Sequence, residues 1–150
     1  MTQPPLRYRL TLSNGRVAFI DLDDAPRVLT LRWHWRCSRG KEYAWAHWRT
    51  AEGKRTTIGL HRFIMGDPPG MEVDHEDGDG LNCTRENMRV CTHAQNQANM
   101  RSRRGSTGYV GGHHVGSYRP DQLEQAVRDR DRKALELHGP FARLNLPLEP

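Results

Sequence analysis

Alternating hydrophobic and polar residues at the start of the chain predict a β-hairpin. In LRYRLTL (residues 6–12) leucine and tyrosine alternate with arginine and threonine, the period-two pattern of a half-buried strand. Asn14-Gly15 follows, which is a strong signal for a tight turn, and RVAFIDL (16–22) has the composition of the returning strand.

Three runs rich in aromatic and β-branched residues come next, at 31–37, 43–50 and 54–60. Glycine and charged residues separate them, so they predict a three-stranded antiparallel meander. The aromatic side chains have two interpretations, a stacking platform for nucleic-acid bases or the core of the sheet. We favour the core, because a small domain needs large apolar side chains. The residues concerned are Trp33, Trp35, Tyr43, Trp45 and Trp48.

Several helices are expected around and after these strands. Capping residues predict a short helix over 24–30, and LHRFIMG predicts another that ends at Gly66. A longer helix begins at Pro120-Asp121 and ends at Gly139-Pro140. We interpret its alternating charges, Arg128 to Lys133, as a solvated face.

The segment between the two helical regions has strand, loop, strand and helix patterns in turn. MEVDH (71–75) and NMRVCT (87–92) are typical of strands, and the sequence between them is glycine-rich and acidic. Thr92 is suited to cap a helix over 93–104. Arg, Gly and Ser then predominate over 101–117, as in a linker. The whole pattern predicts an α+β fold.

Composition indicates a class of partner without naming a reaction. The formal net charge is +5, and 20 of the 23 basic residues are arginine, whose planar fork suits phosphate. No apolar stretch reaches the roughly 18 residues that span a bilayer, and MTQPPLRYRL lacks the apolar part of a secretion signal. Three cysteines without paired spacing indicate reduced thiols. We therefore expect a soluble, cytoplasmic, nucleic-acid-binding protein that is not secreted.

The acidic loop is unusual in so basic a chain, since five carboxylates fall within residues 72–79 around His75. A calcium loop of the EF-hand kind does not fit, because neither Asp74 nor Asp77 as first ligand places glycine and glutamate where that loop requires them. A zinc clamp does not fit either, because Cys83, Cys91 and His93 include no closely spaced cysteine pair. A third possibility is that Asp74 and a later amide bind one metal ion while His75 faces a water, because adjacent strand residues point to opposite sides.

Here the sequence resembles a known family. Asp74-His75, then Asn87 twelve residues after the histidine and Asn96 nine residues later, resembles the HNH endonuclease motif in its H-N-N form. LHRFIMGDPPGMEVDHEDGDGLN and ENMRVCTHAQNQAN, within 58–104, are similar to the free-standing and intron-borne homing endonucleases of phages. In addition, ELHGPFARLNLP resembles the end of the ethylene-response-factor-type DNA-binding domain, here in a shortened form.

The resemblance implies a ββα-metal fold and a role for each matched residue. His75 would be the general base that activates water, and Asn87 would brace the two strands. Asp74 and Asn96 would hold one divalent cation, Mg²⁺ or Mn²⁺, whose preference for oxygen ligands agrees with these residue types. Arginines that flank the motif would contact DNA phosphates. They are Arg85, Arg89, Arg101, Arg103 and Arg104.

These inferences divide the chain into an N-terminal β-meander region (1–57), the ββα-metal motif (58–104), a linker (105–117) and a helical, DNA-binding-like region (118–150). The expected function is metal-dependent endonuclease activity on double-stranded DNA, by nicking, in a monomer of a bacterial or phage-infected cell. Two alternatives remain. One is a non-catalytic DNA-binding or regulatory module with a degenerate motif, and the other is a nuclease that acts on RNA or structured nucleic acid.

Overall fold

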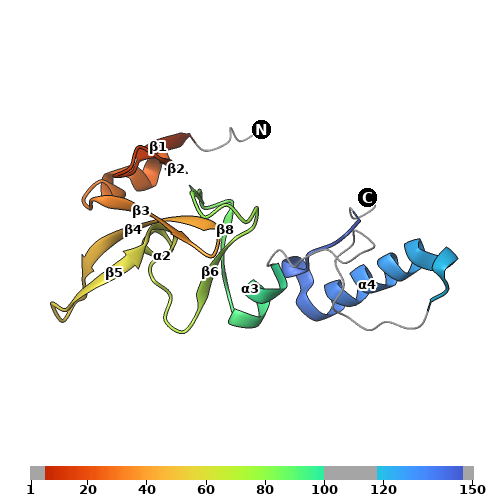
Figure 1. Cartoon of the computed structure of the whole chain (residues 1–150). Helices are drawn as coiled ribbons and strands as arrows, with labels where there is room; N and C mark the ends of the chain where they lie inside the picture. Colours follow the sequence, from red (N-terminus) through yellow and green to blue (C-terminus); the bar gives the residue numbers. More distant parts are fainter. Residues whose placement is uncertain (1–5, 100–117, 147–150) are drawn as a thin grey trace. The chain divides into compact units, whose positions relative to one another are not determined.

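The computed structural model describes residues 6–99 and 118–146, and the chain divides into two compact units, Met1–Thr92 and His93–Pro150 (Figure 1). The first unit contains three small sheets and two short helices, and the second is helical. The fold is therefore of the α+β class, as the sequence predicts. No helix of the described parts has the length and apolarity needed to cross a membrane.

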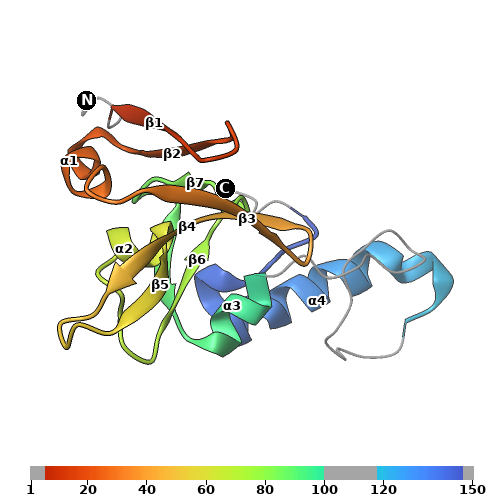
Figure 2. The same ribbon diagram turned by 60° about the vertical axis from the view of Figure 1, so that its left-hand side comes forward.

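The predicted hairpin is confirmed and belongs to a three-stranded sheet. Strands β1 (Arg7–Thr11) and β2 (Val17–Asp21) pair antiparallel around a turn in which Gly15 has φ +81°. An unpredicted strand, β7 (Asn82–Cys83), pairs in parallel with β2 and lies beside it (Figure 2). The end of the acidic loop is thereby part of the N-terminal sheet.

The meander is also confirmed, as strands β3 (Trp33–Ser38), β4 (Lys41–Arg49) and β5 (Arg55–Gly59) in that order. The pairing of Trp33 with Ala46, and of Ala46 with Ile58, gives this sheet a buried face. The core interpretation holds for the buried Trp33, and for Trp35 and Trp48, which pack against the core. Trp45 differs, because it lies on the opposite face with its ring 5.5 Å from that of His34.

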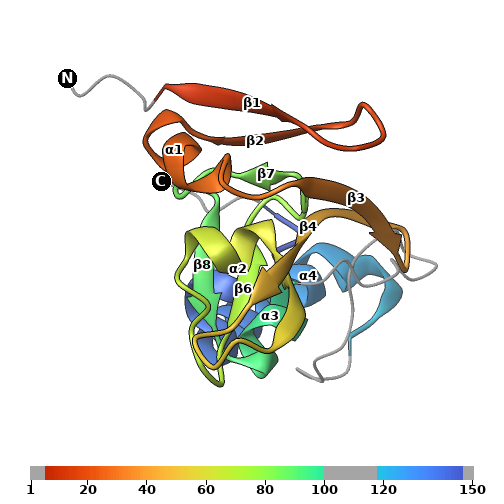
Figure 3. The same cartoon turned by 90° about the vertical axis from the view of Figure 1, so that its left-hand side faces the viewer.

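Two short helices complete the buried side of the first unit. The predicted helix at 24–30 is shorter than expected, a 3₁₀ turn η1 (Leu22–Asp24) followed by α1 (Ala25–Val28). Helix α2 (Leu60–Ile64) buries Leu60, Phe63 and Ile64. It lies next to β6 (Glu72–His75), which pairs antiparallel with β8 (Met88–Cys91) (Figure 3).

Arg85 links the loop before β8 to the N-terminal segment. Its guanidinium donates from Nε to Asp24 Oδ2 at 2.8 Å and from a terminal nitrogen to Asp24 Oδ1 at 2.7 Å. Its backbone N–H donates to Asp21 Oδ2 at 2.9 Å. Because both carboxylates are buried, each needs such donors to offset the loss of water.

The second unit contains α3 (His93–Asn99), the 3₁₀ turn η2 (Pro120–Gln122), helix α4 (Leu123–His138) and the 3₁₀ turn η3 (Gly139–Phe141). The predicted start and end of the long helix are confirmed. Its expected solvated face is wrong at Arg130 and Asp131, which are buried. Asp131 accepts hydrogen bonds from the backbone N–H groups of Asn145 and Leu146, so it holds the segment after the helix.

We predict that Arg85→Ala lowers the free energy of unfolding by about 1–2 kcal/mol, because it removes the forked donor of a buried carboxylate. Urea denaturation at neutral pH measures this. The control is Arg7→Ala, which breaks the exposed Arg7–Glu86 pair and should change stability by less than about 0.5 kcal/mol. Equal losses in the two variants would contradict the linking role of Arg85.

Candidate active site around His75

The imidazole of His75 lies in a small cluster of polarisable side chains. His75 is the last residue of β6 and is only 6% exposed. Its ring centroid is 5.1 Å from that of His61 on α2 and 6.2 Å from that of Tyr43 on β4. Its Nε2 is 3.6 Å from Cys83 Sγ on β7. Three separate parts of the first unit thus converge on this histidine.

A close approach of backbone to ring requires glycine at position 80. A Cβ on Gly80 would overlap the carbonyl oxygen of Glu42 and the ring of Tyr43. Only a residue without a side chain lets the acidic loop pack against β4 at this point. The packing places the end of the loop beside the His75 cluster.

Burial sets the protonation of the cluster. It lowers the pKa of His75, although the carboxylates of Asp77, Asp74 and Asp79 act in the opposite direction. Burial, with the neighbouring His75, lowers the pKa of His61 to about 3. The pKa of the Cys83 thiol is raised by burial. Near pH 7 the site therefore contains two neutral imidazoles and a neutral thiol. The imidazoles can accept protons, whereas the protonated thiol is not a nucleophile.

Cys83 can select the tautomer of His75. Its Sγ is 3.6 Å from the carbonyl oxygen of Gly80 as well as from Nε2 of the imidazole. When the thiol donates to Gly80, the sulfur accepts from Nε2–H, and the lone pair of the neutral ring is on Nδ1. In this arrangement Nδ1 is the nitrogen that can take a proton.

Asp74 is directed to the other side of the β6–β8 pair. It lies opposite Arg89 in the register, and the Arg89 guanidinium donates to Asp74 Oδ2 from Nε at 3.1 Å and from a terminal nitrogen at 3.0 Å. Both side chains are largely buried, at 8% exposure for Asp74 and 18% for Arg89. Arg89, which the sequence suggests as a phosphate contact, thus neutralises the carboxylate expected to bind metal.

The side chain of Asn87 holds the acidic loop. Its Oδ1 accepts from the backbone N–H of Asp77 at 3.1 Å, and its Nδ2 donates to the carbonyl of Asn82 at 2.8 Å and to Asp77 Oδ1 at 3.0 Å. Asp77 also accepts from the backbone N–H of Asp79. Burial acts to raise the pKa of Asp77, but these hydrogen bonds and one from Asn82 outweigh it and keep the pKa below its usual value. The loop carboxylates of Glu76, Asp77 and Asp79 are exposed, and two of them, Asp77 and Asp79, accept hydrogen bonds from backbone N–H groups of the loop.

The two residues predicted to bind metal come from different units. Asp74 is in the first unit, whereas Asn96 lies on α3 of the second, so their convergence on one ion stays a prediction. Within residues 6–99 and 118–146 no three His, Cys, Asp or Glu side chains are grouped as a metal site. The donor chemistry of a carboxylate and an amide does suit a hard divalent cation. An ion at Asp74 would share that carboxylate with Arg89 or replace its guanidinium.

The other predicted DNA contacts fall into two groups. The guanidinium of Arg85 is bound to Asp24, a structural contact that local sequence does not reveal. Arg101, Arg103 and Arg104 lie outside the described residues.

Two neighbours of His75 have a place in the site that the sequence does not predict, namely Tyr43 and Cys83. The sequence favours a sheet core for Tyr43 and offers Cys83 only as a zinc ligand. Their contacts with His75 depend on the packing of strands distant in sequence. The one available signal is Gly80, whose lack of a side chain permits that packing.

Comparison with known families supports the relation suggested by the motif. The family model of the HNH endonucleases matches residues 65–98, a segment that contains β6, the acidic loop, β8 and most of α3. It includes Asp74, His75, Asn87 and Asn96. No curated protein and no solved structure matches the chain. The match supports nuclease activity on DNA, and HNH nucleases generally use a divalent metal.

The burial of His61 predicts an acid-sensitive fold. The neutral ring is favoured in the folded state, whereas the unfolded chain takes up a proton near the ordinary pKa of 6.5, so stability falls as the pH falls below that value. Between pH 7 and pH 5 this histidine should account for a loss of about 2 kcal/mol.

Thermal and urea denaturation of the wild type and His61→Phe at the two pH values measure this loss. The variant should retain about 2 kcal/mol more of its stability at pH 5, relative to its own value at pH 7. His93→Phe, at an exposed histidine, is the control and should behave as the wild type does. The same pH dependence in His61→Phe and the wild type would contradict the assignment.

Proposed function

We propose that this chain is a metal-dependent endonuclease that hydrolyses phosphodiester bonds of double-stranded DNA and nicks one strand. The single observation that carries the proposal is the position of His75. It ends the first strand of a strand–loop–strand element, inside the segment that matches HNH endonucleases, and its ring is kept neutral by burial, which lowers its pKa.

In the proposed reaction His75 is the general base. Its Nδ1 takes a proton from a water molecule, the water oxygen attacks phosphorus, and the bond from phosphorus to the 3′ oxygen breaks. A neutral imidazole in such a role contributes on the order of 10²–10⁴ to the rate. In this proposal Cys83 is a positioning residue: when its thiol donates to the carbonyl of Gly80, its sulfur accepts from Nε2–H, and the lone pair of the neutral ring is on Nδ1.

Asn87 supports this geometry from the loop side. Its three hydrogen bonds hold Asp77 and Asn82, and its backbone carbonyl accepts from the N–H of Glu76, the residue after the base. The loop that follows His75 is therefore held at both ends.

Asp74 and Asn96 would hold the cation, Mg²⁺ or Mn²⁺. When bound, such an ion stabilises negative charge on the phosphate and the departing oxygen. The carboxylate is preformed and buried, and Arg89 keeps it oriented. The monomeric state, the phage homing type and the DNA-binding role of the C-terminal region remain predictions from the resemblance.

A second candidate function, a DNA-binding module that does not cleave, is favoured by a specific observation. The His75 side chain is buried, and Asp74 already has a guanidinium partner. As a general base, His75 must contact a water molecule. As a metal ligand, Asp74 must have a carboxylate whose charge is available to the cation. Cleavage therefore requires that binding of substrate and cation open His75 and redistribute the charge at Asp74.

Nicking of supercoiled plasmid tests the proposal. We expect open circles with Mg²⁺ or Mn²⁺ and none with EDTA. His75→Ala should lose at least about 10²-fold in rate while it still binds DNA, because a general base acts on the reaction and little on affinity.

Two controls separate the alternatives. His93→Ala, at an exposed histidine of the second unit, should nick at the wild-type rate. If the wild type and His75→Ala bind duplex DNA equally but neither nicks with either metal, the non-catalytic module is the right description. Preferential cleavage of RNA in direct competition with duplex DNA would instead favour the alternative of a nuclease that acts on RNA or structured nucleic acid.

A further inference from the structure

The face of the β3–β4–β5 sheet opposite the core is basic and aromatic. Strand alternation and register give this face a set of arginine, histidine and tryptophan side chains, which we call the basic face. Within these three strands the one carboxylate, Glu42, points to the other side, where it accepts from Trp35 Nε1 and pairs with Arg16. The basic face consists of His34, Arg36, Trp45, His47, Arg49 and Arg55.

At one end of the basic face two arginines lie directly opposite each other. Arg49 and Arg55 are cross-strand partners, and both are exposed. Arg49 donates to the carbonyl of Gly53 at 3.2 Å, and among the residues that the structure describes neither guanidinium has a carboxylate partner. Like charges in directly opposed positions destabilise a sheet by a fraction of a kcal/mol. The repulsion between Arg49 and Arg55 would be relieved by an anion bound between the two guanidinium groups.

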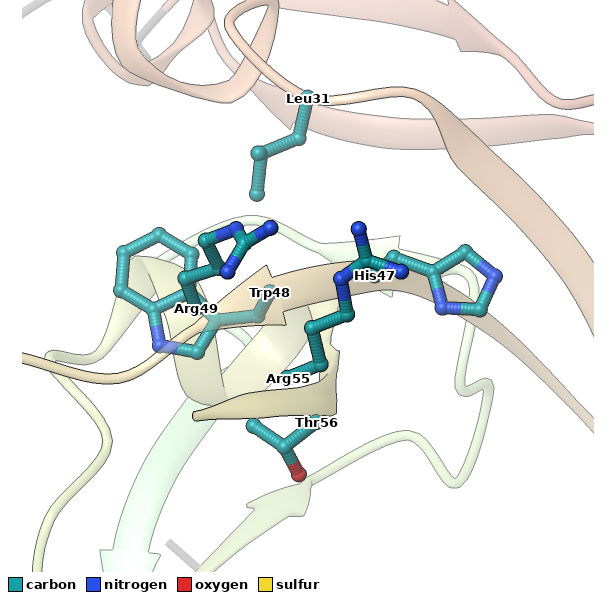
Figure 4. A pocket seen from close by; sticks show the side chains of 6 residues that line it. All are labelled: Leu31, His47, Trp48, Arg49, Arg55 and Thr56. Carbon is teal, nitrogen blue, oxygen red and sulfur yellow. The ribbon is translucent and has the colours of Figure 1, made fainter. Parts of the chain in front are cut away.

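A pocket of about 560 Å³ lies at this pair. Figure 4 shows the guanidinium groups of Arg49 and Arg55 turned to the same side of the strands, toward Leu31, with His47 beside Arg55 and Trp48 beside Arg49. The pocket thus offers two forked donors, an imidazole and an indole, without a carboxylate. Two guanidinium forks next to each other suit phosphate oxygens.

The basic face continues from this pocket toward His75. Rings of His34, Trp45 and His47 form a contiguous cluster, with centroids 5.2–6.1 Å apart. Farther along the same side of β4, Tyr43 contacts the ring of His75. From Tyr43 to Arg49 the strand spans about 20 Å at roughly 3.3–3.4 Å per residue. A single small anion would occupy only one end of such a row.

We propose that the basic face binds the sugar–phosphate backbone of duplex DNA, with Arg49, Arg55 and His47 holding phosphates at the pocket. One strand of duplex carries a charge for about every 3.4 Å of helix axis, so a backbone segment can meet several of these donors at once. The aromatic rings between the cations provide apolar surface for the sugars. The inference rests on the proposed function, because the DNA bound on the basic face would be the substrate and would extend along the face toward His75.

Binding of a duplex of about 30 base pairs in EDTA tests the inference without cleavage. The affinity is measured as a function of salt for the wild type and for the double variant Arg49→Gln/Arg55→Gln. Loss of two phosphate contacts should reduce the slope of log K against log salt by about 2 and weaken binding most at low salt. Arg49→Lys/Arg55→Lys should retain most of the slope, because the charges remain.

A matched control removes the same charge elsewhere. Arg7→Gln/Arg16→Gln takes away two exposed arginines that already pair with Glu86 and Glu42. Its slope should change by much less than that of the pocket variant. An unchanged slope in Arg49→Gln/Arg55→Gln, or an equal fall in the control, would overturn the proposal. Circular dichroism should show all the variants folded, with the pocket variant no less stable than the wild type.

The outcomes separate this inference from the proposed function. Nicking by the wild type, together with an unchanged slope in the pocket variant, rejects the basic face and keeps the nuclease. A reduced slope in a chain that never nicks keeps the basic face and rejects the nuclease. The ring proton signals of His47 give a local readout. They should shift with the duplex, and an equal shift with the same concentration of inorganic phosphate would assign the pocket to small anions instead.

Discussion

The forked ion pair between Arg85 and the buried Asp24 joins the segment before β8 to the N-terminal part of the first unit, and the geometry around His75 depends on it. The same residue's backbone N–H binds Asp21, and the neighbouring residues 82–83 pair with β2. A buried carboxylate without a donor is costly, and the fork of Arg85 supplies the two shortest hydrogen bonds to Asp24, with Arg27 a longer third at 3.4 Å. These contacts place Cys83 beside His75 and Asn87 across the acidic loop. Without them, a loop over 76–81 that carries three carboxylates would have little reason to keep one conformation.

Three of the five carboxylates of the acidic cluster, those of Asp74, Asp77 and Asp79, have specific partners in the structure. Asp74 is balanced by Arg89, while Asp77 and Asp79 accept hydrogen bonds from the loop itself. The negative charge of these three carboxylates is thereby compensated by individual hydrogen-bond donors rather than by the general excess of arginine. Much of that excess remains on exposed surfaces such as the basic face of the meander, which has no carboxylate of its own.

Burial favours neutral side chains on one side of the β6–β8 pair and strengthens an ion pair on the other. On one side it lowers the pKa of His75 and of His61 and keeps both rings neutral, as a proton acceptor requires. On the other it strengthens the attraction between Asp74 and Arg89 by removing water. A cation at Asp74 would therefore compete with a preformed charge partner, and metal affinity and the position of Arg89 should be linked.

The sequence by itself determined the order of most elements, because period-two alternation, the Asn14-Gly15 turn and helix-ending glycines act over a few residues. It also determined the HNH-like spacing of Asp74, His75, Asn87 and Asn96, and with it the kind of chemistry to expect. Tertiary structure decided the rest. It made β7 a strand and assigned Arg85 to Asp24 and Arg89 to Asp74. It also buried Arg130 and Asp131 in a helix whose charges suggest full exposure, and it gathered Tyr43 and Cys83 around His75. The contacts of Arg85 with Asp24 and Asp21 join residues that are separated by 61 and 64 positions in the sequence. Such pairing follows from the shapes of the packed elements and from the need to satisfy buried charge. Neither leaves a periodic signal in the chain.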